Sequence, residues 1–324
     1  MRAVNLQDET ASKIGVTHVG YALFALIALA VPFIGLYPVF VMKLLCFAIF
    51  ACAFNLLLGF TGLLSFGHAA FLGSAAYATG WVVRALNLTP EVGVLAGVAV
   101  AAAVGLVVGV IAIRRQGIYF AMITLALAQM VYFICLQAPF THGEDGLQGV
   151  PRGKLFGIWS LESDIAMYYF VLVAFALVFL FIRRIVHSPF GQVLKAIREN
   201  EPRAVSLGYA VDRYKLLAFV LSTALAGLAG SLKTLVVGFA TLTDVEWQMS
   251  GEVILMTLLG GLGTFFGPVL GAGIVIALQD RLADKVGSWV TVIIGAIFVV
   301  CVLAFRRGIV GEFQAFLEKR RARG

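Results

Sequence analysis

The sequence predicts an all-α, polytopic integral membrane protein. Of its 324 residues, 61% are hydrophobic and only 13% are charged, whereas soluble domains carry roughly 45 to 50% apolar and about 25% charged residues. The mean hydropathy is +0.99, and the apolar residues recur in successive runs from end to end instead of forming one anchor. The composition therefore excludes an ordinary soluble domain and predicts a single membrane domain.

Successive apolar runs give the expected helices, since a helix needs about 20 apolar residues to cross a bilayer. We predict roughly ten spans, at 19–36, 39–58, 68–86, 91–112, 118–137, 166–182, 215–237, 249–263, 266–281 and 288–305. The exact number of crossings between 249 and 281 stays open. The first run contains Ala28-Leu29-Ala30, which weakly resembles a signal-peptidase site, but apolar residues continue through it and favour a spanning helix. Residues 19–305 thus form the predicted transmembrane domain.

The formal net charge of +7 comes from basic residues that flank the apolar runs. Arg114-Arg115 and the segment 183–215 are basic and two predicted spans apart, so the positive-inside rule places both in the cytoplasm. The N-terminal segment 1–18 and the basic tail 306–324 then also lie inside, and the acidic, glycine-rich connection 138–165 is predicted as an external loop. The basic residues form no stripe interleaved with aromatic residues, which argues against a nucleic-acid partner.

Two glycine-rich blocks interrupt the helical pattern. The first, Gly59 to Gly73, would be weak as regular helix, and broken backbone at membrane depth is tolerated only where protein buries it or a water-filled path lies beside it. The second, Gly260 to Gly271, echoes its Phe-Gly and Leu-Gly pairs, and paired interruptions often mark a transport site. The candidate translocation-path residues are Gly62, Ser65, Gly67, His68, Gly73, Gly260, Gly261, Gly263, Gly267 and Pro268. A tight turn with small-residue packing, without any internal repeat, is the alternative.

Candidate metal ligands and catalytic groups are scarce in the sequence. His68 can hydrogen-bond a substrate, although a lone histidine is more often a structural donor, and no second ligand stands at metal-binding spacing from it. The four cysteines form no C-x-x-C pair. Ser65 and His68 are three residues apart but have no third group beside them, so we expect neither a metal site nor catalytic residues.

Ionisable residues inside the apolar runs are few. Lys43, Arg84, Lys233 and Glu252 lie near predicted span ends, where they can snorkel towards water. A proton or sodium relay usually shows as several buried carboxylates or histidines, and no such series is visible. The pattern therefore argues against ion-coupled transport.

The segment Ser188–Gly208 predicts two short helices on the cytoplasmic side. Val193, Leu194 and Ile197 fall on one face of the first helix, and Asn200 or Glu201 can cap the second. An amphipathic element of this kind either lies against lipid headgroups or docks into a partner protein. Because acidic residues stand among the basic ones, a protein partner is favoured.

The order and spacing of these motifs carry a resemblance that covers nearly the whole chain. The first glycine-rich block, the 188–208 segment continuing to Ser222–Gly230, and the second glycine-rich block together resemble the M-type membrane subunit of bacterial branched-chain amino acid ABC importers. The loop departs from the EAA-G consensus of other importers. The ATPase-coupling residues implied by the resemblance are Arg198, Glu199, Asn200, Glu201, Arg203, Ala204, Leu207 and Gly208.

The resemblance implies a heteromeric machine in the bacterial inner membrane, with both termini of this chain in the cytoplasm. An H-type permease subunit, two cytoplasmic ATPase subunits and a periplasmic substrate-binding protein would be its partners, beside the lipid bilayer. ATP and magnesium would bind the ATPase subunits, because the only Gly-Lys of this chain, Gly153-Lys154, is followed by Leu155 and makes no P-loop. We therefore expect no cofactor on this chain itself.

Several functions stay open at this point. The expected function is import of leucine, isoleucine and valine. The same type of machine could instead carry urea, short-chain amides, aromatic acids or other small solutes. From other classes, a self-sufficient secondary transporter or channel and a membrane enzyme remain as alternatives.

Overall fold

A computed structural model describes residues 29, 37–304 and 308–312. The predicted span 19–36, apart from Leu29, lies outside the described residues. The same holds for the segment 1–18 and for most of the tail 306–324. The other nine predicted spans lie within the described part, up to position 304.

The described chain is built almost entirely from helices. Nine of them match the remaining predicted spans: α2 (Pro38–Thr61), α3 (His68–Ala85), α4 (Pro90–Ala112), α5 (Ile118–Gln137), α6 (Asp164–His187), α9 (Val211–Val237), α10 (Trp247–Gly260), α11 (Gly267–Val286) and α12 (Val290–Ala304). The shorter elements are η2 (Pro139–Thr141), η3 (Gly143–Asp145), β1 (Lys154–Leu155), β2 (Trp159–Ser160), α7 (Pro189–Glu199), α8 (Glu201–Ser206), η4 (Leu242–Asp244) and η5 (Gly287–Trp289). The predicted all-α class is confirmed.

Five described helices, α2, α4, α5, α6 and α9, are long and apolar enough to cross a membrane. By contrast, α10 has only 14 residues, short of the roughly 20 that a full crossing needs. The total of about ten crossings therefore stays a prediction.

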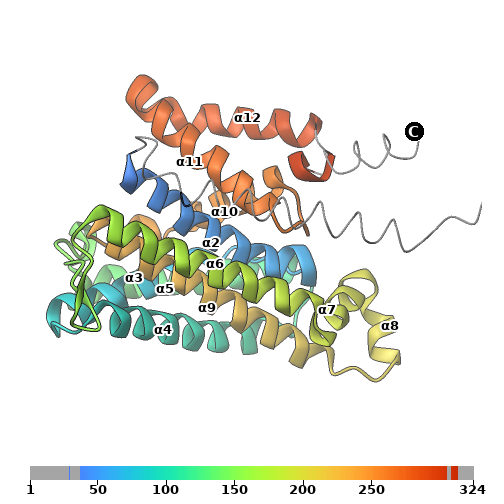
Figure 1. Ribbon diagram of the computed structural model, residues 1–324. Helices are drawn as coiled ribbons and strands as arrows, with labels where there is room; N and C mark the ends of the chain where they lie inside the picture. The colour runs from blue at the N-terminus through green and yellow to red at the C-terminus, as the bar shows by residue number, and fades with distance from the viewer. Residues whose placement is uncertain (1–28, 30–36, 305–307, 313–324) are drawn as a thin grey trace, which may run out of the picture.

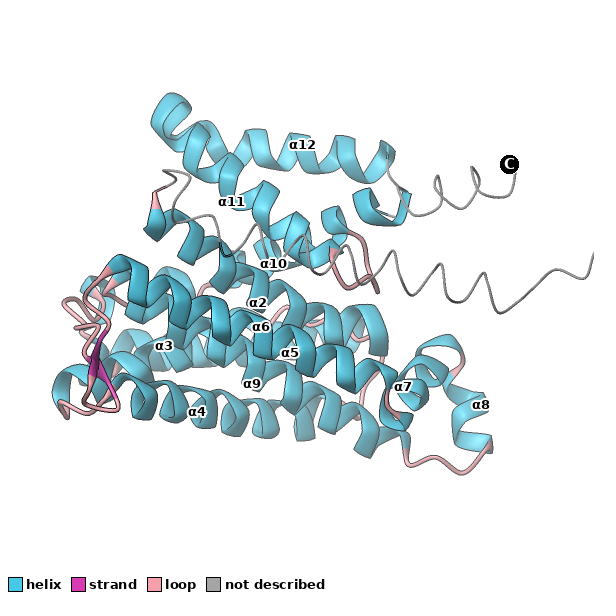
Figure 2. Cartoon of the chain, viewed as in Figure 1, coloured by secondary structure: helices cyan, strands magenta, loops and turns pink. Residues whose placement is uncertain are grey.

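Figure 1 shows the long helices lying roughly side by side, with α2 in the middle of the molecule. On one side of α2, α9 packs against α2, α3 and α4; on the other, α10 and α11 pack against α2. The short helices α7 and α8 project beyond α6 and α9 at one end of the bundle, which we call the α7–α8 end. The hairpin β1–β2 and its neighbouring loops lie at the opposite end (Figure 2).

Helix ends differ from the predicted apolar runs because hydropathy marks only the apolar part of a helix. The charged residues after position 182 continue α6 to His187, and α9 begins at Val211, ahead of the start predicted at 215. The connection between these helices is thus 188–210, not 183–215. In turn, α10 ends at Gly260, before the predicted 263, because the glycines that follow leave the helical conformation.

Close helix packing in the bundle depends on small residues. One buried face of α4 consists of small residues at four-residue intervals: Gly93, Gly97, Ala101, Gly105 and Gly109. A Cβ atom at Gly97 would overlap the hydroxyls of Thr79 on α3 and Ser231 on α9. These two hydroxyls hydrogen-bond each other at 2.8 Å. Glycine lets three backbones approach closely enough for this contact, which is how helices associate in lipid.

The segment after α6 folds into the two short helices that the sequence predicts. The Ser188 hydroxyl accepts a 3.3 Å hydrogen bond from the Gly191 N–H at the start of α7. The Asn200 side chain accepts one of 3.1 Å from the Arg203 N–H and caps α8. Ile197, on the apolar face of α7, is buried. Local capping thus sets both helices.

Candidate translocation and coupling site

The first glycine-rich block contains a break between α2 and α3. Gly62 ends α2 in the left-handed conformation, with φ of 80°, and α3 begins at His68. Between them the Phe66 N–H donates to the Thr124 hydroxyl of α5 at 3.2 Å, and in the first turn of α3 the Ala69 N–H donates to the Ser250 hydroxyl of α10 at 2.9 Å. Neighbouring helices therefore satisfy the free backbone groups, as irregular backbone requires inside a membrane protein.

The second glycine-rich block contains a break between α10 and α11. The Thr264 hydroxyl donates to the Gly261 carbonyl at 2.8 Å and accepts from the Gly267 N–H at 3.1 Å. A Cβ atom at Gly260 would overlap the backbone of Gly267, so this turn requires glycine. Pro268 stands in the first turn of α11, where its missing N–H costs no hydrogen bond.

The two breaks meet at the α7–α8 end. Asn55, on α2 and almost completely buried, donates to the Thr264 carbonyl at 2.9 Å and accepts from the Gly263 N–H at 3.0 Å. The rings of Phe60 and Phe265 lie 5.7 Å apart. Segments about 200 residues apart in sequence are thus joined by one amide side chain, which no sequence motif marks.

Helix α7 lies against this junction. The Arg198 guanidinium donates a hydrogen bond to the Gly59 carbonyl at the end of α2. Its aliphatic part packs on Gly62, where a Cβ atom would stand 3.1 Å from the Arg198 Cγ. A cavity of about 480 Å³ opens beside the contact, between Arg198, Phe60 and Gly263. The predicted coupling segment therefore contacts both glycine-rich breaks.

The predicted coupling residues divide into two groups by their contacts. Glu201 forms a 2.6 Å ion pair with Lys215 of α9 and accepts a 2.7 Å hydrogen bond from Gln116, so it ties α8 to the bundle. Ala204 is buried. Glu199, Asn200, Arg203, Leu207 and Gly208 are exposed. Two exposed apolar neighbours of Leu207 were not singled out from the sequence, Val205 and Tyr209. The sequence signal for them is a group of apolar residues within a polar segment. Tyr209 keeps one contact with the bundle, since its ring lies 6.1 Å from that of Tyr214 on α9.

His68 has the bonding of a structural donor. The Ser222 hydroxyl donates to the Ala53 carbonyl at 2.6 Å and lies 2.9 Å from His68 Nε2, so it accepts from that nitrogen. The ring is fully buried and meets the edge of Phe54 at 4.9 Å. His68 thus links α3 to α9 and α2, and its place on a translocation path stays a prediction.

The remaining path candidates of the first block pack against neighbouring helices. Ser65 is fully buried and accepts a 3.2 Å hydrogen bond from the Gly67 N–H. A Cβ atom at Gly67 would stand 2.8 Å from the Thr124 carbonyl, and one at Gly73 would overlap Val245. Close packing alone accounts for both glycines.

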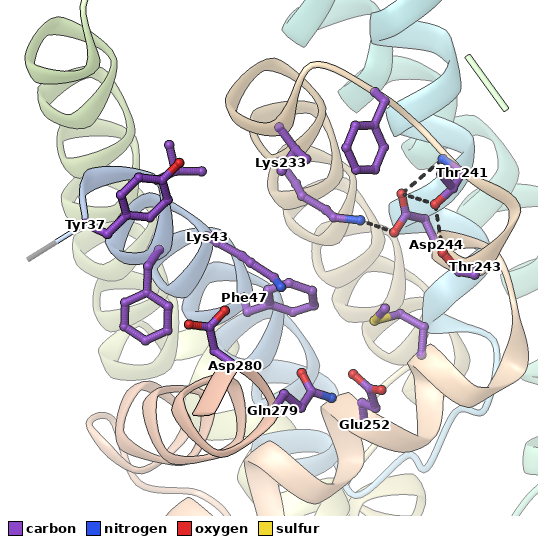
Figure 3. A pocket seen from close by; sticks show the side chains of 15 residues that line it. Tyr37, Lys43, Phe47, Lys233, Thr241, Thr243, Asp244, Glu252, Gln279 and Asp280 are labelled. Carbon is purple, nitrogen blue, oxygen red and sulfur yellow. Dashed lines mark hydrogen bonds and ion pairs between the residues drawn. The ribbon is translucent and has the colours of Figure 1, made fainter. Parts of the chain in front are cut away.

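A second cavity, of about 460 Å³, lies at the end of the bundle opposite α7 and α8. It opens between α2, α9, η4, α10 and α11, and Figure 3 shows charged side chains of both signs around it. Lys233 and Asp244 form a buried ion pair in its wall. The Thr241 N–H donates to the same carboxylate at 3.4 Å. Lys43 and Glu252 line the cavity as well.

Lys43, Lys233 and Glu252 are expected from the sequence to snorkel at separate span ends. The structure instead brings them together from three different helices. The sequence does indicate these residues as candidates, because placing an ionisable residue within a membrane helix costs free energy and such residues often mark functional sites. Their convergence depends on helix packing and cannot be read from spacing along the chain.

Comparison with known proteins identifies the family of this chain. The family described as "Branched-chain amino acid transport system / permease component" matches residues 39–302. The chain belongs to this family. Together with the apolar helices, this makes it a multi-pass membrane protein.

Individual relatives carry related names. The high-affinity branched-chain amino acid transport system permease protein LivM of Salmonella typhimurium is 29% identical over 266 residues, which cover 74% of this chain and 61% of the relative. A probable LivM of Methanocaldococcus jannaschii is 29% identical, over 62% of this chain and 60% of the relative. The high-affinity branched-chain amino acid transport system permease protein LivH of Escherichia coli is 23% identical, over 82% of this chain and 91% of the relative.

The chain thus spans about three fifths of the length of the LivM proteins that it matches. No solved structure matches the chain. In the part of the chain that the structure describes, no three His, Cys, Asp or Glu side chains gather to hold a metal ion.

Proposed function

We propose that this chain is the membrane-spanning permease subunit of an ATP-driven, binding-protein-dependent importer of leucine, isoleucine and valine. It is a transport subunit and not an enzyme. Membership of the permease family and the names of the LivM relatives support the substrate class. The observation that carries the mechanism is the contact of Arg198 on α7 with the junction of the two glycine-rich breaks.

The proposed partners follow from this role. A second, H-type permease subunit pairs with this chain, as the similarity to LivH suggests. Two ATPase subunits bind ATP and magnesium at the α7–α8 end, and a periplasmic binding protein delivers the amino acid at the opposite end. In this orientation α7, α8 and both termini lie in the cytoplasm and the hairpin β1–β2 lies outside. The membrane is the bacterial inner membrane.

The exposed part of the α7–α8 segment suits an ATPase contact. Leu207 is 68% exposed and Val205 is 57% exposed, so they present an apolar group outside the bundle. Charged residues of both signs, Glu199 and Arg203, stand beside them. An apolar centre with a polar rim is the usual composition of a protein interface.

The proposed coupling is mechanical. When the ATPase subunits close, α7 moves with them, and the hydrogen bond from Arg198 transmits the movement to the Gly59 carbonyl. Asn55 then carries it from α2 to the break between α10 and α11. Rigid-body rocking of this kind alternates access in transporters with interrupted helices.

Uptake of radiolabelled leucine in cells tests the proposed function. Cells that lack this gene are rescued with it, in the presence of an intact or a catalytically inactive ATPase subunit. We expect rescue only with the intact ATPase, and competition by unlabelled valine but not by urea. Uptake that persists with the inactive ATPase would favour a secondary transporter. If the cells that lack the gene lost urea uptake but not leucine uptake, urea would replace leucine as the proposed substrate.

A further inference from the structure

The cavity at the end opposite α7 and α8 contains charges that have no ion-pair partner among the described residues. The ion pair of Lys233 and Asp244 is complete within the wall. By contrast, Lys43, Glu252 and Asp280 line the same cavity, and none of them forms an ion pair with a described residue. Within the described part of the chain, the cavity therefore presents one positive and two negative side chains without an ion-pair partner, and of these Glu252 interacts with the Gln279 side chain.

These charges lie near one another without touching. Lys43 and Lys233 are close enough to Glu252 to interact with it electrostatically. Figure 3 shows the Lys43 and Glu252 side chains coming from α2 and α10, on different sides of the cavity, with the Gln279 amide pointing towards Glu252. Lys43 and Glu252 are half-buried, and partly buried charges cost free energy unless hydrogen bonds or opposite charges compensate them. A ligand that carries both charges would neutralise both sides at once.

Apolar side chains form one part of the remaining cavity wall, and Thr241, Thr243 and Gln279 add polar groups to it. The apolar part contains Phe40, Phe47, Val237 and Met249. Its volume of about 460 Å³ lies within the range of small-molecule sites, in which a mainly apolar lining holds a few placed polar groups. An aliphatic side chain can bury itself against these residues while its polar head meets the charges.

We propose that this cavity receives the transported amino acid as a zwitterion. Lys43 faces its carboxylate, Glu252 faces its ammonium group, and the phenylalanine, valine and methionine side chains contact its aliphatic part. The inference rests on the proposed function and adds the residues that recognise the cargo. Urea or an amide, which carries no net charge on either end, would leave Lys43 and Glu252 uncompensated. The charge pattern thus favours an amino acid over these neutral solutes.

Transport by the purified complex tests the inference. The complex of this chain with its permease partner and ATPase subunits is reconstituted in proteoliposomes with saturating leucine-loaded binding protein. We expect Lys43→Met and Glu252→Gln each to lower leucine uptake by about tenfold to a hundredfold, the loss that follows removal of a charge-assisted hydrogen bond. Hydrolysis of ATP stimulated by the binding protein should persist, which shows that the variant complex is folded and assembled.

Two charged residues at the same end of the bundle but outside the cavity serve as matched controls. Arg84 is exposed in the last turn of α3, and Glu162 is exposed before α6. Arg84→Met and Glu162→Gln remove the same charges and should leave uptake unchanged. Normal uptake in both Lys43→Met and Glu252→Gln would overturn the inference while leaving the proposed function intact. An unaltered complex that imports no leucine would overturn both.

Photolabelling gives a readout that needs no transport. A diazirine analogue of leucine should label peptides that contain Phe47, Val237 or Met249 in the purified complex. Excess leucine should prevent this labelling, whereas 4-methylpentanoate and 3-methylbutylamine, which each carry only one of the two charges, should not. Equal protection by the singly charged compounds, or labelling confined to other peptides, would contradict the zwitterion site.

Discussion

Asn55 should be a principal stabilising residue of the bundle, because it joins the two glycine-rich breaks. Its side chain is 3% exposed and makes hydrogen bonds of 2.9 and 3.0 Å with the backbone of Thr264 and Gly263. In an Asn55→Ala variant both backbone groups lose that partner. Each unsatisfied group costs about 1 to 3 kcal/mol, so we expect the variant to lose about 2 to 6 kcal/mol of stability.

The buried thiols of the chain supply an assay for this loss. Cys46 and Cys52 lie buried on α2, the helix that also holds Asn55, and they are free. A thiol-reactive fluorophore will label them only when the bundle opens, so its fluorescence reports thermal unfolding in detergent. For a loss of about 2 to 6 kcal/mol, the midpoint should fall by roughly 5 to 20 °C.

An exposed amide provides the control for Asn55. Gln148 donates a 3.0 Å hydrogen bond to the Asp145 carbonyl in an exposed loop. Because water can replace that bond, Gln148→Ala should change stability by no more than about 0.5 kcal/mol. An Asn55→Ala variant whose midpoint shifted no further than that of Gln148→Ala would show that this side chain does not hold the two breaks together. The proposed transmission of movement from α2 to α10 would then be refuted.

Three other predictions concern packing and coupling. Gly230→Ala places a methyl group onto a backbone carbonyl of α3, so its free energy of unfolding should fall by about 1 to 3 kcal/mol, measured by the same thermal assay. Gly251→Ala is the control: a methyl group there meets open space, so stability should stay the same or rise. Arg198→Ala should lower the leucine imported per ATP hydrolysed in proteoliposomes, with exposed Arg213→Ala as the unaffected control, and an unchanged ratio would refute the coupling route. Leu207→Glu changes an exposed residue, so the chain should fold normally but fail to co-purify with the ATPase subunits; normal co-purification would contradict the proposed interface.

Much of the helical architecture could be predicted from the sequence because the bilayer imposes a simple rule on length and hydropathy. The spans predicted at 91–112 and 118–137 agree with α4 and α5 to within a residue. Capping chemistry likewise predicted that the coupling segment divides at Asn200 or Glu201, and the structure shows Asn200 as the cap. Boundaries failed where charged residues extend a helix beyond its apolar part, as in α6.

The candidate sites could be predicted only in part. Glycine-rich interruptions located both breaks, since broken helix has a local signature, but the contact between them depends on Asn55, an ordinary-looking polar residue within an apolar run. The charged cavity was missed for a related reason. Lys43 and Glu252 are about 200 positions apart, and only the packing of α2 against α10 and α11 places them around one space.

The central claim is that this chain imports branched-chain amino acids with energy supplied by partner ATPases. Accumulation of radiolabelled leucine in proteoliposomes that contain the purified complex tests it most directly, with loaded binding protein on one side of the membrane and ATP on the other. We predict accumulation that requires ATP and is lost when the ATPase subunits are inactive. Leucine accumulation that proceeds equally without ATP, or none with all components active, would contradict the account.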